Sequence, residues 1–510
     1  MEKRNKFFVY GLILLGTTMD NLNSMSTLTM TENIQKAFKT NSSTTSWVLS
    51  GYGLTLGSFI MVTGKISDII GPHNLYLMGI AVIWISSLIC ALLPHTSIIP
   101  VIVFRAIQGI GASSLLPSTI AMTANYFSGE NEKYRGPAVA IMIVVLTATL
   151  GLGIVIGGAF SLTNIGYQGF FYFVFAYSFL VDTALLFLII PVEKTIEGAS
   201  LKLRNINFVS SFLMIVGCLL VILGLTEGGN HWVSAKAIAP VIVGFFTIMA
   251  SFLYESYYIR PYQKRHANDY ESNDWRLQVD LLFPAEILRI PNFPGLLLVC
   301  GIYYATMTMN ISVVVQYHNY IDHDSTIISA LKAFTMSVGL VFGAVVYRES
   351  YYKKIGLKIM FMLSGLISLG AVIWLSRLSY KDPKSFWVYE MVPLLLFGYG
   401  FNMFFNIYLP TVINHTPLHL QGVVNGVFQT FSQIMLSIGN ALIPSIIGNI
   451  KKAVTLAEKE NLHNKFVAVC YVIIGFQAVS FLIVVFFINV PRNEKEDCTP
   501  EESLEKSSSE

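Results

Sequence analysis

The chain has 510 residues, of which 54% are hydrophobic and only 12% are charged, and its formal net charge is +3. Soluble domains carry roughly 25% charged residues, so this composition excludes a soluble globular enzyme. It also excludes a disordered chain, a disulfide scaffold and a nucleic-acid-binding protein, because the charge is too sparse and too balanced. The composition is typical of an integral membrane protein.

Long apolar stretches recur along the chain. A membrane-spanning helix needs about 20 mostly apolar residues. About fourteen such stretches stand between polar breaks, at 7–29, 46–64, 75–93, 98–127, 137–160, 167–191, 206–225, 236–258, 294–315, 326–347, 356–376, 386–411, 419–446 and 465–490. They far exceed the roughly 10-residue alternating strands of a membrane barrel. We therefore predict an all-α membrane protein with about 14 transmembrane helices.

The first stretch follows a basic start, as a signal peptide would, but it carries Asp20, Asn21 and Asn23. Because it has no compact apolar core and no convincing cleavage site, we expect it to be a retained helix.

The predicted helices form two halves with an inserted pair. The predicted blocks are a six-helix half at 1–191, two additional helices at 192–258, a cytoplasmic loop with an interfacial segment at 259–293, a second six-helix half at 294–490 and a disordered cytoplasmic tail at 491–510. Two six-helix halves are a common transporter plan. Outside the spans, most Lys and Arg residues fall in the amino terminus, the even-numbered loops and the tail, so both termini are expected to be cytoplasmic.

Two charged residues stand well inside predicted spans: Asp20 in the first and Arg105 in the fourth. Each costs roughly 2.5–3.5 kcal/mol at a helix centre and normally faces a partner or a water-filled cavity. They could neutralise each other, and an aspartate that loses a cationic partner binds a proton more readily. We therefore predict that they couple proton movement to conformation, with a static pair that only fixes packing as the alternative.

The other ionisable residues are weaker candidates for a functional role. We expect structural roles for Asp182 and Lys332, and interfacial positions for Glu255 and Glu390 near span ends. The five cysteines have no metal-like spacing, no HExxH arrangement occurs among the histidines, and no P-loop is present. We expect no metal site, no catalytic residues, and no ATP-driven pumping by this chain alone.

Small and amide-bearing residues supply further candidates. Gly151, Gly153, Gly157 and Gly158 in the fifth span form a face that lets another helix approach closely, as a sliding contact or as simple tight packing. The aromatic and amide residues that suit a cavity for amphipathic solutes are Asn23, Tyr303, Tyr304, Asn310, Asn402 and Asn406.

Two motifs carry a family resemblance. The segment GKISDIIG, from Gly64 through Asp68 to Gly71, resembles the cytoplasmic signature loop of the major facilitator superfamily. The segment FRAIQGIGA, which contains Arg105, Gln108 and Gly109, resembles the fourth-span motif of that superfamily. The resemblance implies that the loop Asp caps and charge-pairs helices in the outward-facing state, and that the fourth-span Arg takes part in proton transfer.

Asp20 stands where the fourteen-span drug:proton antiporter branch has its first-span Asp. Over nearly the whole chain, the sequence is most similar to fungal transporters of the aminotriazole-resistance and boron-efflux type. It departs from the family pattern at Ile69, Pro72 and His73, where basic residues are usual, and it lacks the proline expected before the pair Gly157-Gly158.

The resemblance implies alternating access, with proton-driven export of small organic or weakly polar toxic compounds across the plasma membrane, or secondarily the vacuolar membrane. The expected partners are the lipid bilayer, a small-molecule substrate and protons, with no nucleic acid, no cofactor beyond the proton gradient, and a monomeric state. The alternatives are uptake or facilitated transport of a small nutrient or an ion such as ammonium, and a non-transporting receptor on the same fold.

Overall fold

The computed structural model describes residues 5–40, 42–192, 206–229, 232–266, 274–279, 281–282, 287, 290–346, 355–382, 384–414, 416, 421–448 and 452–488. The regular elements of these residues are all helical. The predicted tail at 491–510 and most of the predicted interfacial segment around Leu281–Leu288 lie outside the described residues.

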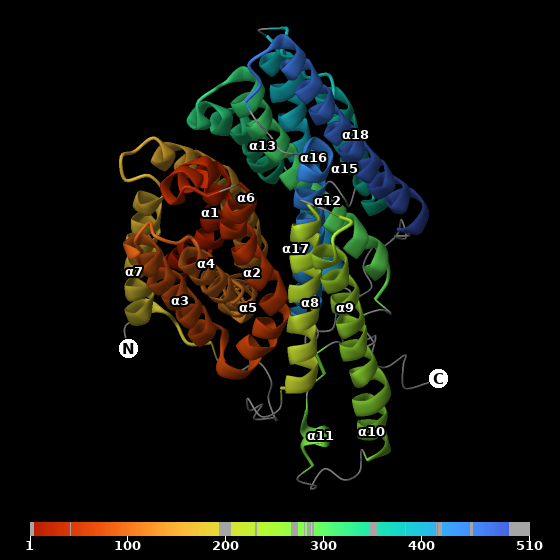
Figure 1. The fold of residues 1–510 in the computed structure, drawn as a ribbon. Coiled ribbons are helices and arrows are strands. Elements are labelled where there is room, and N and C mark those ends of the chain that lie inside the picture. The colour runs from red at the N-terminus through yellow and green to blue at the C-terminus, as the bar shows by residue number, and fades with distance from the viewer. Residues whose placement is uncertain are drawn as a thin grey trace.

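The first group of helices lies at the left of Figure 1. It comprises α1 (Lys6–Phe38), α2 (Ser42–Ile70), α3 (Pro72–Leu92), α4 (Ile99–Ala112), α5 (Leu115–Tyr126), α6 (Arg135–Ser161) and α7 (Tyr167–Leu188). Only Ser113 and Ser114 separate α4 from α5, and the two together form one candidate span, Ile99–Tyr126. The predicted span 98–127 therefore corresponds to two consecutive helices.

Two helices follow, and the first of them lies beside both groups. They are α8 (Phe208–Gly228) and α9 (Ala235–Leu253), and α9 continues through the π-helical turn η3 (Tyr254–Ile259) into α10 (Arg260–Arg265). In Figure 1 this continuous helix extends below the rest of the bundle, near the short helix α11 (Trp275–Gln278).

The last group occupies the upper right of Figure 1. It comprises α12 (Phe293–Tyr317), α13 (Thr326–Val346), α15 (Leu357–Leu375), α16 (Val392–Asn414), α17 (Gln421–Ile447) and α18 (Leu456–Phe487). Two π-helical turns belong to this group: η5 (His318–Asp322) follows α12, and η6 (Phe386–Met391) precedes α16.

Local sequence explains several helix starts. The side chains of Asn5, Asn207 and Ser234 each accept a hydrogen bond from a backbone N–H at the start of α1, α8 and α9. Thr455 and Glu458 form a reciprocal capping box at the start of α18. These bonds satisfy backbone groups that would otherwise lack a partner at the helix end.

Thirteen helices of the described residues are long and apolar enough to cross a membrane. The one predicted span that does not meet this criterion is the first, 7–29, which corresponds to α1 and has 33 residues in the structure. Its middle turns carry Asp20, Asn21 and Asn23, and it packs against α2, α6 and α7, which shield these polar groups from lipid. The predicted all-α membrane fold is confirmed, with α1 as a polar central helix.

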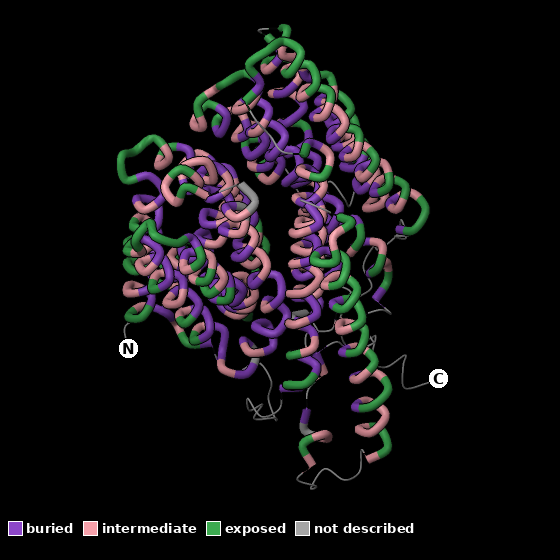
Figure 2. The backbone as a smooth tube through the Cα atoms, in the orientation of Figure 1, coloured by how far each residue is buried: buried purple, intermediate pink, exposed green. Residues whose placement is uncertain are grey.

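Two hydrophobic cores hold the bundle together. One is built from buried residues between Val9 and Val192. The other is built mostly from residues between Leu282 and Ile488, with contributions from α1, α2, α6 and α8. The groups meet where α6 packs against α13 and α2 packs against α17, and α8 packs against both α2 and α17 (Figure 1). Exposed residues line the outer helices and α9 (Figure 2). Many of the exposed side chains are large and apolar, as a lipid-facing surface requires.

Glu255, which lies near a span end, is buried between segments of the protein. It is 1% exposed, and its carboxylate accepts hydrogen bonds from Asn207 Nδ2 at 3.2 Å and from the backbone N–H of Leu282 at 2.8 Å. The carboxylate therefore joins the start of α8 to the chain that precedes α12. Position along the sequence did not reveal that these segments cover it.

Candidate functional site

Arg105 of α4 is fully buried, and uncharged oxygens surround its guanidinium. Nε donates to the Val48 carbonyl at 3.1 Å, and Nη1 donates to Gln108 Oε1 at 2.8 Å and Asn23 Oδ1 at 3.4 Å. Nη2 donates to Thr27 Oγ1 at 3.0 Å and to the Asn23 carbonyl at 3.3 Å. Arg105 therefore ties α1 and α2 to α4, and none of these acceptors carries a negative charge.

Asp20 and Arg105 lie close together, but not as the direct pair that their charges suggest. No ion pair joins these two described residues within 4.0 Å. Tyr52 of α2 lies between them: its hydroxyl donates to Asp20 Oδ1 at 2.7 Å, and Arg105 Cζ lies 4.4 Å from the centroid of its ring. We call Asp20, Tyr52 and Arg105 the charge triad. An aromatic ring separates the two charges because α2 packs beside both α1 and α4.

The charge triad faces the second group of helices. The Tyr304 side chain of α12 lies within electrostatic range of Asp20. Gln108 extends the network in the other direction, because its Nε2 donates to Ser87 Oγ of α3 at 2.6 Å. The carboxylate of Asp20 therefore stands where the two groups of helices approach each other.

The predicted cavity residues separate into different environments. Asn23 binds Arg105 and is completely buried, and Tyr304 lies near Asp20. Tyr303 instead points into the core of the second group. Its ring stacks on Phe404 at 4.6 Å, and its hydroxyl lies 3.3 Å from Ser364 Oγ in α15. Adjacent tyrosines on one helix point in different directions, although the Phe401 ring contacts both.

Three further amides lie in α12 and α16. Asn406 Nδ2 donates to Asn402 Oδ1, and Asn310 is completely buried. Among the described residues, both amide atoms of Asn310 and Nδ2 of Asn402 are buried without a hydrogen-bond partner. Buried polar atoms are normally satisfied, so these groups are available to a polar ligand or to water.

The glycines of α6 serve two neighbouring helices. A Cβ on Gly153 would lie 2.9 Å from Met25 Cβ, and one on Gly157 would overlap the Ser26 carbonyl, so both face α1. A Cβ on Gly158 would lie 3.2 Å from Ala330 Cβ of α13. Gly151 also faces α13, where a Cβ would overlap Ser337. The small residues therefore allow α6 to contact its own group and the other group at once.

The remaining motif glycines also mark close contacts or turns. Gly64 is buried within α2, and a Cβ on Gly109 would overlap the Tyr52 carbonyl. Gly71 has φ +94° and directly precedes α3, which explains why this turn requires glycine. The side chain of Asp68 lies outside the described residues.

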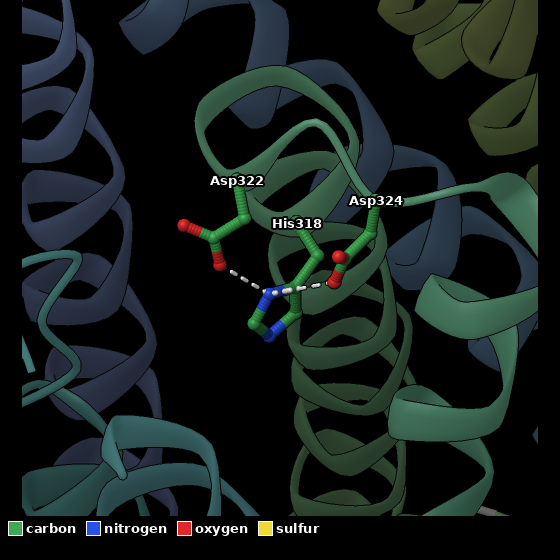
Figure 3. Close-up of side chains that lie close together, drawn as sticks. All are labelled: His318, Asp322 and Asp324. Atoms are coloured by element: carbon green, nitrogen blue, oxygen red, sulfur yellow. Dashed lines mark hydrogen bonds and ion pairs between the residues drawn. The ribbon is translucent and has the colours of Figure 1, made fainter. Parts of the chain in front are cut away.

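A second ionic cluster lies where α12 leads into α13, and it contains His318, Asp322, Asp324, Lys332 and Glu390. His318 Nδ1 is 2.6 Å from Asp322 Oδ2 and 3.6 Å from Asp324 Oδ2 (Figure 3). Its Nε2 is 2.7 Å from Glu390 Oε2. Glu390 is 1% exposed, because η6 carries this carboxylate inward against the end of α12.

His318, Asp322 and Asp324 have the ligand types and the proximity of a metal site. However, the Lys332 ammonium lies 2.6 Å from Asp324 Oδ2 and 3.0 Å from His318 Nδ1. The chain therefore places its own cation among these atoms.

Comparison with known proteins identifies the family. The model of the Major Facilitator Superfamily matches residues 7–440. Multidrug resistance protein 3 of Bacillus subtilis (strain 168) is 24% identical over 456 residues, covering 88% of this chain and 80% of the relative. The aminotriazole resistance protein of Saccharomyces cerevisiae is 22% identical over 246 residues, covering 48% of this chain and 44% of the relative.

The methylenomycin A resistance protein of Streptomyces coelicolor is 31% identical over 125 residues, only 26% of its length. The fold resembles the crystal structure of the POT family transporter PepTSo with a TM-score of 0.62 at 11% identity, covering 94% of this chain and 97% of that chain. It also resembles the crystal structure of the human organic anion transporter MFSD10 with a TM-score of 0.57 at 12% identity, covering 94% of this chain and 100% of that chain. The chain belongs to the Major Facilitator Superfamily and is an integral, multi-pass membrane transport protein.

Proposed function

We propose that this protein exports small organic or weakly polar toxic compounds by alternating access, and that protons moving in the opposite direction drive it. The names of three relatives, which refer to multidrug, aminotriazole and methylenomycin A resistance, support the class of substrate. The charge triad supports proton coupling.

The observation that carries the proposal is the way in which Asp20 is bound. Its carboxylate accepts a hydrogen bond from the neutral hydroxyl of Tyr52, while neutral oxygens bind the Arg105 guanidinium. Asp20 can therefore gain a proton without breaking a direct ion pair. Hydrogen bonds to an ionised group are roughly twice as strong as those between neutral groups, so protonation weakens the Tyr52 bond that joins α1 to α2.

This change occurs beside the contact between the two groups of helices. Asp20 lies within electrostatic range of Tyr304 on α12, and α2 packs against α17. Loss of the negative charge alters the interaction of α1 with both neighbours. In our proposal, the protonated and ionised states of Asp20 favour opposite orientations of the two halves.

The proposed solute path lies between the charge triad and α12–α16. Tyr304 offers a ring and a hydroxyl, and its ring lies 5.6 Å from that of Phe405. The unpartnered amide atoms of Asn310 and Asn402 supply hydrogen-bonding groups. Aromatic walls with a few polar groups suit amphipathic solutes.

The arrangement in the cell completes the proposal. We place both termini in the cytoplasm, because most Lys and Arg residues outside the spans lie on that side, and we place the protein in the plasma membrane as a monomer. The proton gradient supplies the driving force, with no cofactor.

A host strain that lacks its own drug exporters tests this proposal. It would express the wild type, Asp20→Asn, or the control Glu460→Gln, which alters an exposed α18 carboxylate that pairs with Lys381 of the same half at 3.9 Å. Growth and intracellular solute would be measured on a panel that includes 3-amino-1,2,4-triazole and ethidium. We expect the wild type and the control to lower accumulation of some compounds and Asp20→Asn to have no effect. Raised accumulation would instead indicate uptake, and unchanged accumulation of every solute would indicate a receptor; either result contradicts export.

A further inference from the structure

We propose that His318 is a second proton-binding site, and that its proton decides whether Nδ1 pairs with Asp322 or with Lys332. The proposed link to transport rests on the function proposed above, whereas proton binding by His318 is argued from the geometry alone.

The site is built from two interruptions of helical geometry. His318 begins the π-helical turn η5 after α12, and Glu390 lies in the π-helical turn η6 before α16. Such turns occur frequently at functional sites. Both side chains are at least 97% buried, and Glu390 Oε1 has no hydrogen-bond partner among the described residues. A buried carboxylate with a free oxygen is costly unless an additional charge or proton compensates it.

The contacts around Nδ1 cannot all form in one protonation state. Asp322 Oδ2, at 2.6 Å, is an acceptor when ionised and requires a proton on Nδ1. The Lys332 ammonium, at 3.0 Å, is only a donor and requires the Nδ1 lone pair. One nitrogen cannot be donor and acceptor at once. In the charged ring, Nδ1–H donates to Asp322 and Lys332 binds Asp324, whereas in the neutral ring Lys332 donates to Nδ1 and Asp322 loses its bond.

Nε2 completes the switch. It lies 2.7 Å from Glu390 Oε2, so an N–H at this position donates to Glu390 in both states. The proton gained or lost is therefore the one on Nδ1, and a single proton exchanges one partner of His318 for another.

The surrounding charges favour uptake of that proton. Three carboxylates face the ring, and Lys332 is the cation that opposes protonation. Ionisable groups approach the ring from four neighbouring segments: Asp322 and Asp324 from the chain after α12, Lys332 from α13, and Glu390 from η6. From α18 come His463, which bonds to Tyr317, and Cys470, which lies in electrostatic range of Glu390. With His318 neutral, the cluster has three negative carboxylates and one positive ammonium. A positive charge on the His318 ring brings the net charge of the cluster closer to zero.

The cluster holds the start of α13, the helix that contacts α6 of the other group. Ala330 of α13 faces Gly158 of α6, and Lys332, two residues later, points to the opposite side of α13, toward His318 and Asp324. Its ammonium also lies 5.4 Å from the centroid of the Phe386 ring. When Lys332 changes partners, the start of α13 changes its attachment to α12 and η6. Protonation of His318 therefore biases the α6–α13 contact at the end of the bundle that lies away from α10 (Figure 1).

Histidine-selective 15N NMR of the full-length protein in lipid nanodiscs tests proton binding. His318→Gln identifies the His318 signal among the nine histidines. We expect this signal to titrate, with its midpoint raised by about one pH unit in Lys332→Met, which removes a positive charge, and lowered by about one unit in Glu390→Gln. Both variants retain His318. The assignment is therefore also checked by finding the one signal whose titration midpoint rises in Lys332→Met and falls in Glu390→Gln. His323→Gln, in the same loop, is the matched control and should leave the signal unchanged.

The conformational part has its own measurement. Spin labels at Leu162 and Ile328, which are exposed beyond α6 and near the start of α13, report the distance between the halves. We expect this distance to change with pH at the NMR midpoint in the wild type and to be pH-independent in His318→Gln. The proposal is overturned if the His318 signal does not titrate between pH 4 and 9, or if its midpoint is the same in Lys332→Met and Glu390→Gln as in the wild type. A wild-type spin-label distance that does not change with pH overturns the conformational part. Asp20→Asn should keep the His318 titration, so loss of transport in that variant tests the proposed function separately.

Discussion

Tyr52 is the residue that makes the charge triad a unit. Its ring lies against Arg105 and its hydroxyl binds Asp20, so each charge influences the other through a neutral side chain. A cation over an aromatic ring contributes about 0.5–2 kcal/mol, depending on its burial. The triad is therefore stabilised without the direct ion pair that would resist protonation of Asp20.

Replacing Tyr52 by Phe tests the hydroxyl alone. The ring contact with Arg105 stays, while the charge-assisted bond to Asp20, worth roughly 1.5–3 kcal/mol, is lost. We expect proton-driven efflux to fall about tenfold, measured as initial rates in cells. Tyr126→Phe is the control, because it removes a hydroxyl that binds the Ile190 carbonyl at 2.7 Å in the same half. Equal rates in both variants would remove the Tyr52 hydroxyl from the mechanism.

Arg105 sets the stability of the triad. Lysine keeps the charge but has three donors in place of five, so we expect Arg105→Lys to leave acceptors unpaired on α1 or α2. Each unpaired buried acceptor costs about 1–3 kcal/mol, and thermal unfolding in detergent should show a clear loss of stability. Arg276→Lys, at a partly exposed pair with Asp274, should change the unfolding temperature much less, because exposed ion pairs contribute little to stability. Similar unfolding temperatures for both variants would contradict this account.

Sequence reasoning reached some of these residues for a physical reason. Asp20 and Arg105 stand out because charge inside an apolar span is expensive. Tyr52 does not stand out among 25 tyrosines, because its role depends on how α2 packs against α1 and α4. His318 and Glu390 are 72 residues apart, and only the packing of η5 against η6 brings them together.

At the scale of the helices, glycines on α6 allow close contact with two neighbours. Gly153 and Gly157 face α1, and Gly151 and Gly158 face α13. The sequence predicted a small-residue face but not that it serves two partners. The reason is that glycine spacing shows where a helix can approach, and tertiary structure decides which helix does.

Adding a methyl group to α6 tests this contact. In Gly157→Ala, the new Cβ would overlap the Ser26 backbone, so α1 must move, at a cost of about 1–3 kcal/mol. We expect a lower unfolding temperature for the purified protein. Gly370→Ala on α15 is the control, because nothing lies within 4 Å of its Cβ, and alanine there should be neutral or stabilising by roughly 0.5–1 kcal/mol. Equal unfolding temperatures for Gly157→Ala and Gly370→Ala would contradict the close contact between Gly157 and α1.

The prediction of individual spans succeeded where hydropathy dominates. Thirteen helices meet a simple criterion of length and apolarity. The polar helix α1 does not, yet it forms a long central helix, because neighbouring helices rather than lipid surround its polar residues. The proposed block boundaries stay a prediction, as do the roles of the candidate site residues.

At the scale of the whole molecule, sidedness can be measured directly. Exposed positions Val233, after α8, and Val454, before α18, should face outward, and Trp275 should face the cytoplasm. In a Cys498→Ser background, we expect an impermeant maleimide to label Val233→Cys and Val454→Cys in intact cells, and Trp275→Cys only after permeabilisation. The reverse pattern would invert the proposed topology. A glycan at Asn414, a sequon proposed to be cytoplasmic, would contradict it independently.

The two halves contact each other through α6–α13 and α2–α17. The charge triad lies beside a contact between them, and the His318 cluster holds the start of α13. This placement allows the protonation of one or two side chains to act on the relative orientation of the halves. Such coupling requires only that the two orientations differ in proton affinity.

The most direct test of the central claim is solute flux in proteoliposomes with an imposed pH difference. The probe is the panel compound that cells expressing the wild type accumulate least, and the proteins are wild type, Asp20→Asn and Glu460→Gln. We predict that the gradient drives uphill flux in the wild type and in Glu460→Gln, and that Asp20→Asn retains only downhill exchange. Uphill flux in Asp20→Asn equal to that of the wild type would contradict proton coupling through Asp20.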